Sequence, residues 1–302
     1  MTDRTSTDAS AALPLGRPHR MLDVGHSQVP YWCFGEGPDL FFVHGWPLTS
    51  ATWRELVPSL SEHFTCHLID LPGTGESEWD ADSEISMRAH AKTVAACIDQ
   101  VGIDRYSFVG QDSGGAICRM VAAVHADRVE GIVMGNTEIP GHVPPMLTAA
   151  LPLLKLPGSV AALRLGLQWR PLRDSKAFLG GCFDDMSLAD GSFGELFIDP
   201  LIRTPRALKG QLRLAGTLSA ADFDGLYRVH PKIKAPVLLI WGVDDPWFPL
   251  EHARPMLEQF PAGAELVELP GKLLIHEERP EAFVEHCVRF LAPSAKAAAC
   301  SA

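Results

Sequence analysis

The sequence lacks the features that mark several large classes of protein. Positive charge is scarce, because 26 Lys and Arg stand against 37 Asp and Glu among 302 residues, for a formal net charge of −11. No cluster of Lys and Arg offers a surface for phosphates, so we expect no nucleic-acid partner. No run of about 18 uncharged apolar residues occurs either, and the sequence predicts no membrane-spanning helix.

The seven cysteines are scattered along the chain and include no Cys-x-x-Cys pair. This pattern is typical of free thiols in a reducing compartment, and not of a disulfide framework or a zinc site. The first twenty residues are polar and lack the apolar stretch of a secretory signal. The sequence therefore predicts a cytoplasmic protein without a metal or cofactor, and it is compatible with a monomer or a homodimer.

What the sequence does contain is a regular alternation of short apolar runs and helical patterns. With 46% hydrophobic residues the chain can bury a large core. The alternation predicts an α/β fold, a mainly parallel sheet with helices on both faces. The first two predicted strands flank a Gly-Glu-Gly-Pro-Asp turn, so we expect them to pair as an antiparallel hairpin. Predicted strands lie at 31–34, 40–43, 65–70, 106–109, 131–135, 236–241 and 264–269, and predicted helices at 87–101 and 277–291, with a further helix ending at His125.

The stretch 141–227 breaks this alternation. It is rich in Leu, Ala and Pro, and it predicts helices without strands. Because it lies between two core strands, we interpret it as a helical cap over the carboxyl edge of the sheet, where open α/β sheets bind ligands. A helical excursion without a gating role is the alternative. The predicted organisation is a core of 21–140 and 228–293, a cap of 141–227, and disordered tails at 1–20 and 294–302.

A predicted strand leads into the hexapeptide Gly-Gln-Asp-Ser-Gly-Gly at 110–115, and a predicted helix follows. A nucleophile on so sharp a strand-to-helix turn needs small residues two positions before and after it, because larger side chains would clash across the turn. Centring on Asp112 places Gly110 and Gly114 there, whereas centring on Ser113 would place a bulky glutamine at the first position. Asp112 is therefore the predicted elbow residue. The alternative is a glycine-rich turn in which Asp112 caps the helix.

This hexapeptide resembles the elbow of haloalkane dehalogenases and α/β epoxide hydrolases, whose aspartate attacks carbon. The resemblance covers nearly the whole chain outside the tails and the cap, and it implies an α/β-hydrolase fold with an eight-stranded sheet. It also implies that the His-Gly-Trp-Pro loop at 44–47 supplies one backbone N–H of an oxyanion hole, from Trp46, and that Ser113 supplies the other. Such donors stabilise developing negative charge by several kcal/mol.

The same resemblance places the acid of a catalytic triad three residues after the glycine of Trp-Gly-Val-Asp-Asp-Pro (241–246), which is Asp245. The acid would orient and charge-stabilise a histidine. Asp244 is then a turn residue. Some haloalkane dehalogenases carry the acid after the preceding strand, where this chain has Asn136 with Glu138 just beyond. An amide cannot serve as a carboxylate, which favours Asp245.

The histidine of the family is missing from its expected place. It stands seven residues ahead of a proline, and counting back from Pro280 gives Leu273. His276 lies one helical turn later, and it is either a side chain at the start of a helix or a substitute base that a shifted loop brings inward. Asp112 needs no base to attack carbon, because a carboxylate is ionised at pH 7. Hydrolysis of the resulting ester does need one, and a general base contributes roughly 10²–10⁴-fold.

Residues that distinguish the subfamilies are largely absent. Haloalkane dehalogenases usually follow the nucleophile with a tryptophan, and fluoroacetate-type enzymes with an arginine, whereas this chain has Ser113. Trp46 or Trp169 could donate an indole N–H to a halide instead. Of the three tyrosines, only Tyr227 lies near the cap, where an epoxide hydrolase would need one. The apolar stretch 151–165 favours a small apolar substrate.

Two functions from different classes are compatible with these residues. The first is hydrolysis of a haloalkane or epoxide through an alkyl ester of Asp112, with Asp245 as the acid and His276 as a doubtful base. The second is a catalytically impaired protein that binds or rearranges an apolar small molecule, because the histidine is replaced by Leu273.

Overall fold

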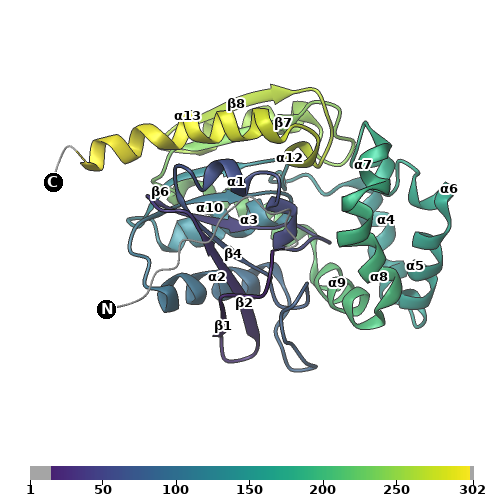
Figure 1. Cartoon of the computed structure of the whole chain (residues 1–302). Helices are drawn as coiled ribbons and strands as arrows, with labels where there is room; N and C mark the ends of the chain where they lie inside the picture. Colours follow the sequence, from purple (N-terminus) through teal and green to yellow (C-terminus); the bar gives the residue numbers. More distant parts are fainter. Residues whose placement is uncertain (1–14, 300–302) are drawn as a thin grey trace.

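The computed structural model describes residues 15–299, with side chains described to residue 292. The chain forms one eight-stranded sheet in the order β1-β2-β4-β3-β5-β6-β7-β8. The pairs β1–β2 and β2–β4 are antiparallel and all other neighbours are parallel, which confirms the predicted α/β class (Figure 1). The strands are β1 (Arg20–Asp23), β2 (Gln28–Phe34), β3 (Asp39–Val43), β4 (Thr65–Ile69), β5 (Tyr106–Gly110), β6 (Val129–Met134), β7 (Val237–Gly242) and β8 (Ala264–Leu269).

The central strands are apolar along their whole length because helices cover both faces of the sheet. Every residue of β5 and β7 is buried. One buried cluster joins the sheet to α2, α3 and α10, and a second joins the opposite face to α1 and α13. The helices around the sheet are α1 (Val57–Leu60), α2 (Met87–Val101), α3 (Ser113–Val124), α10 (Ala220–Val229), α11 (Leu250–Ala253), α12 (Ile275–Glu278) and α13 (Pro280–Ala299).

The predicted hairpin between the first two predicted strands is wrong. β2 pairs with β4, with Tyr31 opposite Ile69, and β3 lies on the far side of β4. The reason is that β3 is flanked by two parallel neighbours, β4 and β5, and so has no free edge for β2. The antiparallel hairpin of this region is instead β1–β2, whose connection turns at Gly25 with a φ of 85°.

Both predicted tails are partly built into the fold. Leu15 is buried, and the Trp32 indole donates to the Gly16 carbonyl at 3.0 Å, so the chain is already packed on the core before β1 begins. At the other end α13 continues to Ala299, past residue 294, where the C-terminal tail was expected to start. The remaining tail residues, 1–14 and 300–302, lie outside the described part of the chain.

Between β6 and β7 the chain contains helices and no strand, and α4–α9 stand together at one end of the sheet (Figure 1). Their apolar side chains divide between two environments. Leu154, Val160 and Leu163 pack on a small cluster of their own, whereas Leu153 and Leu165 are 63% and 67% exposed. The helices are α4 (Pro145–Leu154), α5 (Ser159–Gln168), α6 (Arg170–Arg173), α7 (Met186–Asp190), α8 (Asp199–Arg203) and α9 (Pro205–Thr217).

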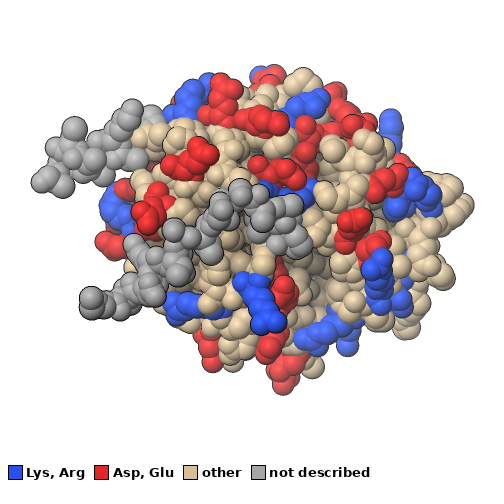
Figure 2. Space-filling model, viewed as in Figure 1, with Lys and Arg blue, Asp and Glu red and all other residues tan. Residues whose placement is uncertain are grey.

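The surface shows no single dominant charge on the face drawn in Figure 2, where Lys and Arg side chains lie interspersed with Asp and Glu. Tan, uncharged area occupies much of the side formed by α4–α6, in agreement with the exposed leucines there. Within the described residues, no helix has both the length and the apolar character that crossing a membrane requires.

Candidate active site

Asp112 occupies a sharp turn between β5 and α3. Its φ of 49° and ψ of −136° make it the one non-glycine residue with a positive φ in the described chain. A Cβ atom at Gly114 would lie 2.1 Å from the Val43 carbonyl oxygen, and one at Gly110 would lie 2.9 Å from Cys118 Sγ. Neither glycine has room for a side chain, because Gly110 faces the start of α3 and Gly114 faces the end of β3. Asp112 is also the residue before the helix, but its carboxylate makes no capping bond.

A buried network fixes this strained backbone. Asp112 N donates to the Asn136 carbonyl at 2.7 Å, and Thr137 Oγ1 lies 2.8 Å from the Asp112 carbonyl. The guanidinium of the fully buried Arg119 donates to Thr137 Oγ1 at 2.9 Å and to the Glu138 carbonyl at 2.8 Å. Left-handed backbone at a non-glycine residue costs about 1–3 kcal/mol and persists only where the surroundings impose it. These hydrogen bonds hold the backbone of Asp112 in this conformation.

Two backbone amides converge on the Asp112 carboxylate. Trp46 N, in the loop after β3, donates to Asp112 Oδ2 at 2.8 Å. The backbone of the neighbouring Ser113, the first residue of α3, also acts on this carboxyl group, where it opposes the rise in pKa that burial causes. Gly45 permits the approach, since a Cβ atom there would lie 2.6 Å from Asp112 Cβ. The structure thus brings the predicted elbow residue and both predicted oxyanion-hole residues together.

Burial and hydrogen bonding act in opposite directions on Asp112. Its residue is 9% exposed, and desolvation raises the pKa of its carboxyl group to about 6, while the bonds from Ser113 and Trp46 lower it. A carboxyl group with this pKa is largely ionised at neutral pH. Asp112 is therefore a desolvated carboxylate that carries its charge under ordinary conditions.

Asp245 follows β7 and is held by three donors. Trp247 N and Phe248 N donate to its Oδ1 at 2.7 and 3.2 Å, and Asn136 Nδ2 donates to its Oδ2 at 2.7 Å. Burial nevertheless raises the pKa of Asp245 to about 7, and the charge of Asp112 adds to this rise. The two carboxylates are consequently within electrostatic reach of each other. Asn136 also bonds the backbone at the end of β7, so it ties the two strand ends together.

No imidazole stands at the expected place for the base. Leu273 is 8% exposed, and its carbonyl accepts a long hydrogen bond of 3.5 Å from Gln111 Nε2. Within residues 15–299 no group of three or more His, Cys, Asp and Glu is arranged to hold a metal ion.

His276 lies elsewhere, in the core beside Thr52, Trp53 and Phe283. It is fully buried, its Nε2 is 2.7 Å from Thr52 Oγ1, and its ring centroid is 4.9 Å from that of Trp53. In the described structure no hydrogen bond joins it to Asp112 or Asp245. Burial and the charge of Arg54 lower the pKa of His276 to about 3, so the ring is neutral.

A family model described as the alpha/beta hydrolase fold matches residues 38–280. The chain belongs to this family. It is 29% identical over 276 residues to haloalkane dehalogenase 2 of Mycobacterium tuberculosis (strain ATCC 25618 / H37Rv), with 87% of this chain and 91% of that protein covered. It is 25% identical over 285 residues to the soluble epoxide hydrolase of Corynebacterium sp. (strain C12), with 91% and 97% covered.

Among solved structures, the enol-lactonase from Burkholderia xenovorans LB400 is similar to this α/β hydrolase, with a TM-score of 0.75 and 24% identity. The match covers 90% of this chain and 100% of the lactonase, and it shows a shared fold. The resemblance to dehalogenases and epoxide hydrolases is thereby confirmed at the level of the family.

The aromatic donors that the sequence suggested for this α/β hydrolase are either hydrogen-bonded elsewhere or largely exposed. The Trp46 indole donates to the Gln211 carbonyl of α9 at 3.0 Å, and Trp169 and Tyr227 are 62% and 53% exposed. Trp247, two residues after Asp245, has a buried indole N–H that lies beside Gly181 and has no hydrogen-bond partner among the described residues. Its position directly after an Asp-Pro pair was the available signal, and sequence reasoning missed it.

Two further ionisable groups surround the carboxylates of the α/β hydrolase. Glu138 is 4% exposed, and burial followed by the charge of Asp112 raises its pKa to about 8, against the opposing charge of Arg119. Cys182 comes from the helical stretch, and burial together with the charges of Asp245 and Asp112 raises the pKa of its thiol. Nothing in the spacing of these residues along the chain indicates that they share one site.

Proposed function

We propose that this α/β hydrolase attacks an electrophilic carbon of a small apolar substrate, a haloalkane or an epoxide, with Asp112. The observation that carries the proposal is a carboxylate on a strained turn with one oxygen already on a backbone amide, at Trp46. Because the pKa of Asp112 is about 6, the group is ionised at neutral pH and needs no base for this step.

In the first step, the free carboxylate oxygen forms a C–O bond with the substrate carbon. Halide leaves with its bonding pair, or the epoxide oxygen takes the pair and then a proton from water. The product is an alkyl ester of Asp112 whose carbonyl oxygen stays on the amides of Trp46 and Ser113.

In the second step, water must attack the ester with the help of a general base. Asp245 has the position of a triad acid, but Leu273 gives it no histidine to orient. We therefore expect ester hydrolysis to be slower by roughly 10²–10⁴-fold than in an enzyme with a base. The protein would form the ester readily and release it slowly.

We further propose that the stretch 141–227 forms a cap that excludes water from this chemistry through its helices α4–α9, whereas its last helix, α10, packs beside α3 on the sheet. Two contacts support a closed arrangement: the Trp46 indole bonds the Gln211 carbonyl, and Leu274 N donates to the Cys182 carbonyl at 3.2 Å. Each joins a loop of the sheet's carboxyl end to the helical stretch. Exclusion of water from the site strengthens the electrostatic interactions within it.

A cytoplasmic location is part of the proposal. The described cysteines are all free, which suits a reducing compartment. We propose a monomer or a homodimer whose partner is the small substrate.

The second candidate is a protein that binds or rearranges an apolar molecule without hydrolysis. Leu273 favours it, and so do three buried carboxyl groups with pKa values raised to about 6, 8 and 7 at Asp112, Glu138 and Asp245. Groups with such values can exchange protons near neutral pH.

The deciding experiment measures turnover and intact mass together. The protein is incubated with a primary bromoalkane or a terminal epoxide, and released bromide or diol is quantified against enzyme. One equivalent of bromide with a stable alkyl adduct on Asp112, absent from Asp112→Ala, is the expected result. Neither product nor adduct would favour the second candidate. Many turnovers would show that a base is present, and His276→Ala then tests whether it is His276.

A further inference from the structure

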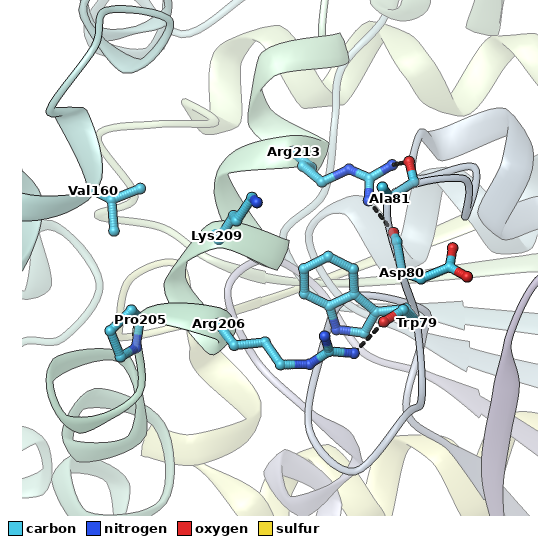
Figure 3. A pocket seen from close by; sticks show the side chains of 8 residues that line it. All are labelled: Trp79, Asp80, Ala81, Val160, Pro205, Arg206, Lys209 and Arg213. Atoms are coloured by element: carbon cyan, nitrogen blue, oxygen red, sulfur yellow. Dashed lines mark hydrogen bonds between the residues drawn. The ribbon is translucent and has the colours of Figure 1, made fainter.

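A hollow of about 600 Å³ lies apart from Asp112, between α9 and the loop at 79–81 (Figure 3). Its volume is within the range of roughly 300–1,000 Å³ typical of small-molecule sites. None of the residues bonded to Asp112 belongs to its lining. The lining residues are Trp79, Asp80, Ala81, Val160, Pro205, Arg206, Lys209 and Arg213.

Three cations from α9 dominate the charge of this hollow, which is a small cluster of Lys and Arg that the sequence analysis did not expect. Arg206, Lys209 and Arg213 are three and four residues apart, so they share one face of the helix. In the described part of the chain, none of them forms a salt bridge with a carboxylate. The one acidic lining residue, Asp80, has its Oδ1 engaged by Asp82 N and Ser83 N. The hollow therefore holds a surplus of positive charge.

The two arginines are fixed without being neutralised. The Arg206 guanidinium lies 4.3 Å from the centroid of the Trp79 ring and donates to the Trp79 carbonyl. The Arg213 guanidinium lies 5.5 Å from the same ring and donates to the carbonyls of Asp80, Ala81 and Ser83. Carbonyl oxygens position a guanidinium without cancelling its charge, although the nearby Asp80 carboxylate offsets part of the charge of Arg213. Of five N–H donors on Arg206, one is used, which leaves the others for a ligand.

The remaining wall is apolar. Figure 3 shows Val160 and Pro205 across the hollow from Trp79, with Lys209 between the two sides. We propose that this hollow binds an amphipathic anion, with a phosphate or carboxylate head on Arg206 and Lys209 and a short apolar tail along Val160, Pro205 and the indole. The proposal is independent of any chemistry at Asp112.

Lys209→Gln is the primary test, because Lys209 has no hydrogen bond in the described structure that its loss would break. Octyl phosphate, below its micellar concentration, is titrated into the full chain at low ionic strength, and binding is measured by calorimetry. Removing a charged donor from the head should weaken binding about ten-fold. Lys92→Gln on the exposed side of α2 is the matched control, since it makes the same charge change away from the hollow.

Three further arms identify what is recognised. Octanol and inorganic phosphate should each bind far more weakly than octyl phosphate, because each lacks one half of the ligand. Asp112→Ala should bind octyl phosphate like the unaltered chain, which separates this proposal from the function proposed for that residue. Sedimentation with vesicles of phosphatidylcholine and phosphatidic acid distinguishes a lipid headgroup from a free anion as the source.

The proposal is overturned by any of three results. These are unchanged affinity in Lys209→Gln, an equal loss in Lys92→Gln, or inorganic phosphate binding as tightly as octyl phosphate. Arg206→Gln provides a second variant, and it should also weaken binding; its Trp79 contact can be checked by tryptophan fluorescence.

Discussion

Asn136 Nδ2 donates to Asp245 Oδ2 at 2.7 Å, so an amide holds the carboxylate that a triad histidine would otherwise contact. The same Asn136 side chain bonds the backbone at the end of β7. Asp245 is therefore preorganised by neutral donors even though no imidazole is present at Leu273. The Asp245 carboxylate can still accept a further hydrogen bond, from an imidazole placed at position 273.

Leu273→His should increase turnover of the bromoalkane, because it restores a base next to an oriented acid. The expected gain is roughly 10²–10⁴-fold in ester hydrolysis. Release of bromide beyond one equivalent, with loss of the adduct mass, is the measurement. Asp245→Asn should reduce this activity strongly in the Leu273→His background and change little without it. A folded Leu273→His variant with no gain would contradict the assignment of position 273.

Formation of the adduct should follow the ionisation of Asp112. Its pKa is raised to about 6, so the attacking carboxylate is depleted below that pH and fully formed above it. The single-turnover rate should therefore rise about ten-fold between about pH 5 and pH 7.5, and then become constant. Intact-mass kinetics across this range, with circular dichroism to verify folding, provide the test. A rate that is flat across the range would be inconsistent with attack by Asp112.

Glu138→Gln should remove a pH dependence from the stability of the fold. Burial raises the Glu138 pKa from 4.5 to about 8, so between these values the folded state holds a proton that the unfolded state has lost. The free energy of unfolding then falls as pH rises, by up to about 1.4 kcal/mol per pH unit. Urea unfolding of Glu138→Gln should show a shallower fall, whereas the exposed Glu265→Gln should behave like the unaltered chain. Equal slopes in all three proteins would refute the role given to Glu138.

Breaking the buried Arg54–Glu277 pair should strongly destabilise the fold. Arg54 Nη1 and Nη2 donate to the two oxygens of Glu277 at 2.9 and 2.8 Å, and both side chains are below 10% exposed. Removal of one partner leaves a buried charge alone, so Glu277→Ala should lower the free energy of unfolding by about 3–5 kcal/mol. Chemical denaturation checks this, with Glu285→Ala on the exposed side of α13 as the control. The double variant with Arg54→Ala should lose less than the sum of the single losses.

Local signals were sufficient for much of the fold. The helix predicted at 87–101 has those bounds in the structure, because Ser86 caps its start and Gly102 ends it with a φ of 81°. The elbow was likewise predictable, although its two glycines have different causes: Gly110 faces Gly114 and Cys118 across the turn, whereas Gly114 faces the end of β3 at Val43.

Contacts between distant segments account for what the sequence did not reveal. The placement of β4 between β2 and β3 depends on the whole sheet, and no turn residue encodes it. The position of His276 could not be predicted, because the ring is hydrogen-bonded to Thr52, which is 224 positions away in the sequence. The gathering of Glu138 and Cys182 around Asp112 likewise arises only once separate elements are packed.

Trp46 links the site to the helical stretch. Its backbone amide donates a hydrogen bond to Asp112, and its indole donates one to the Gln211 carbonyl of α9. If α9 swings outward to admit a molecule, the indole loses its acceptor and the loop that carries the amide loses its anchor. Through this one residue, the position of α9 would then be coupled to the geometry around the Asp112 carboxylate.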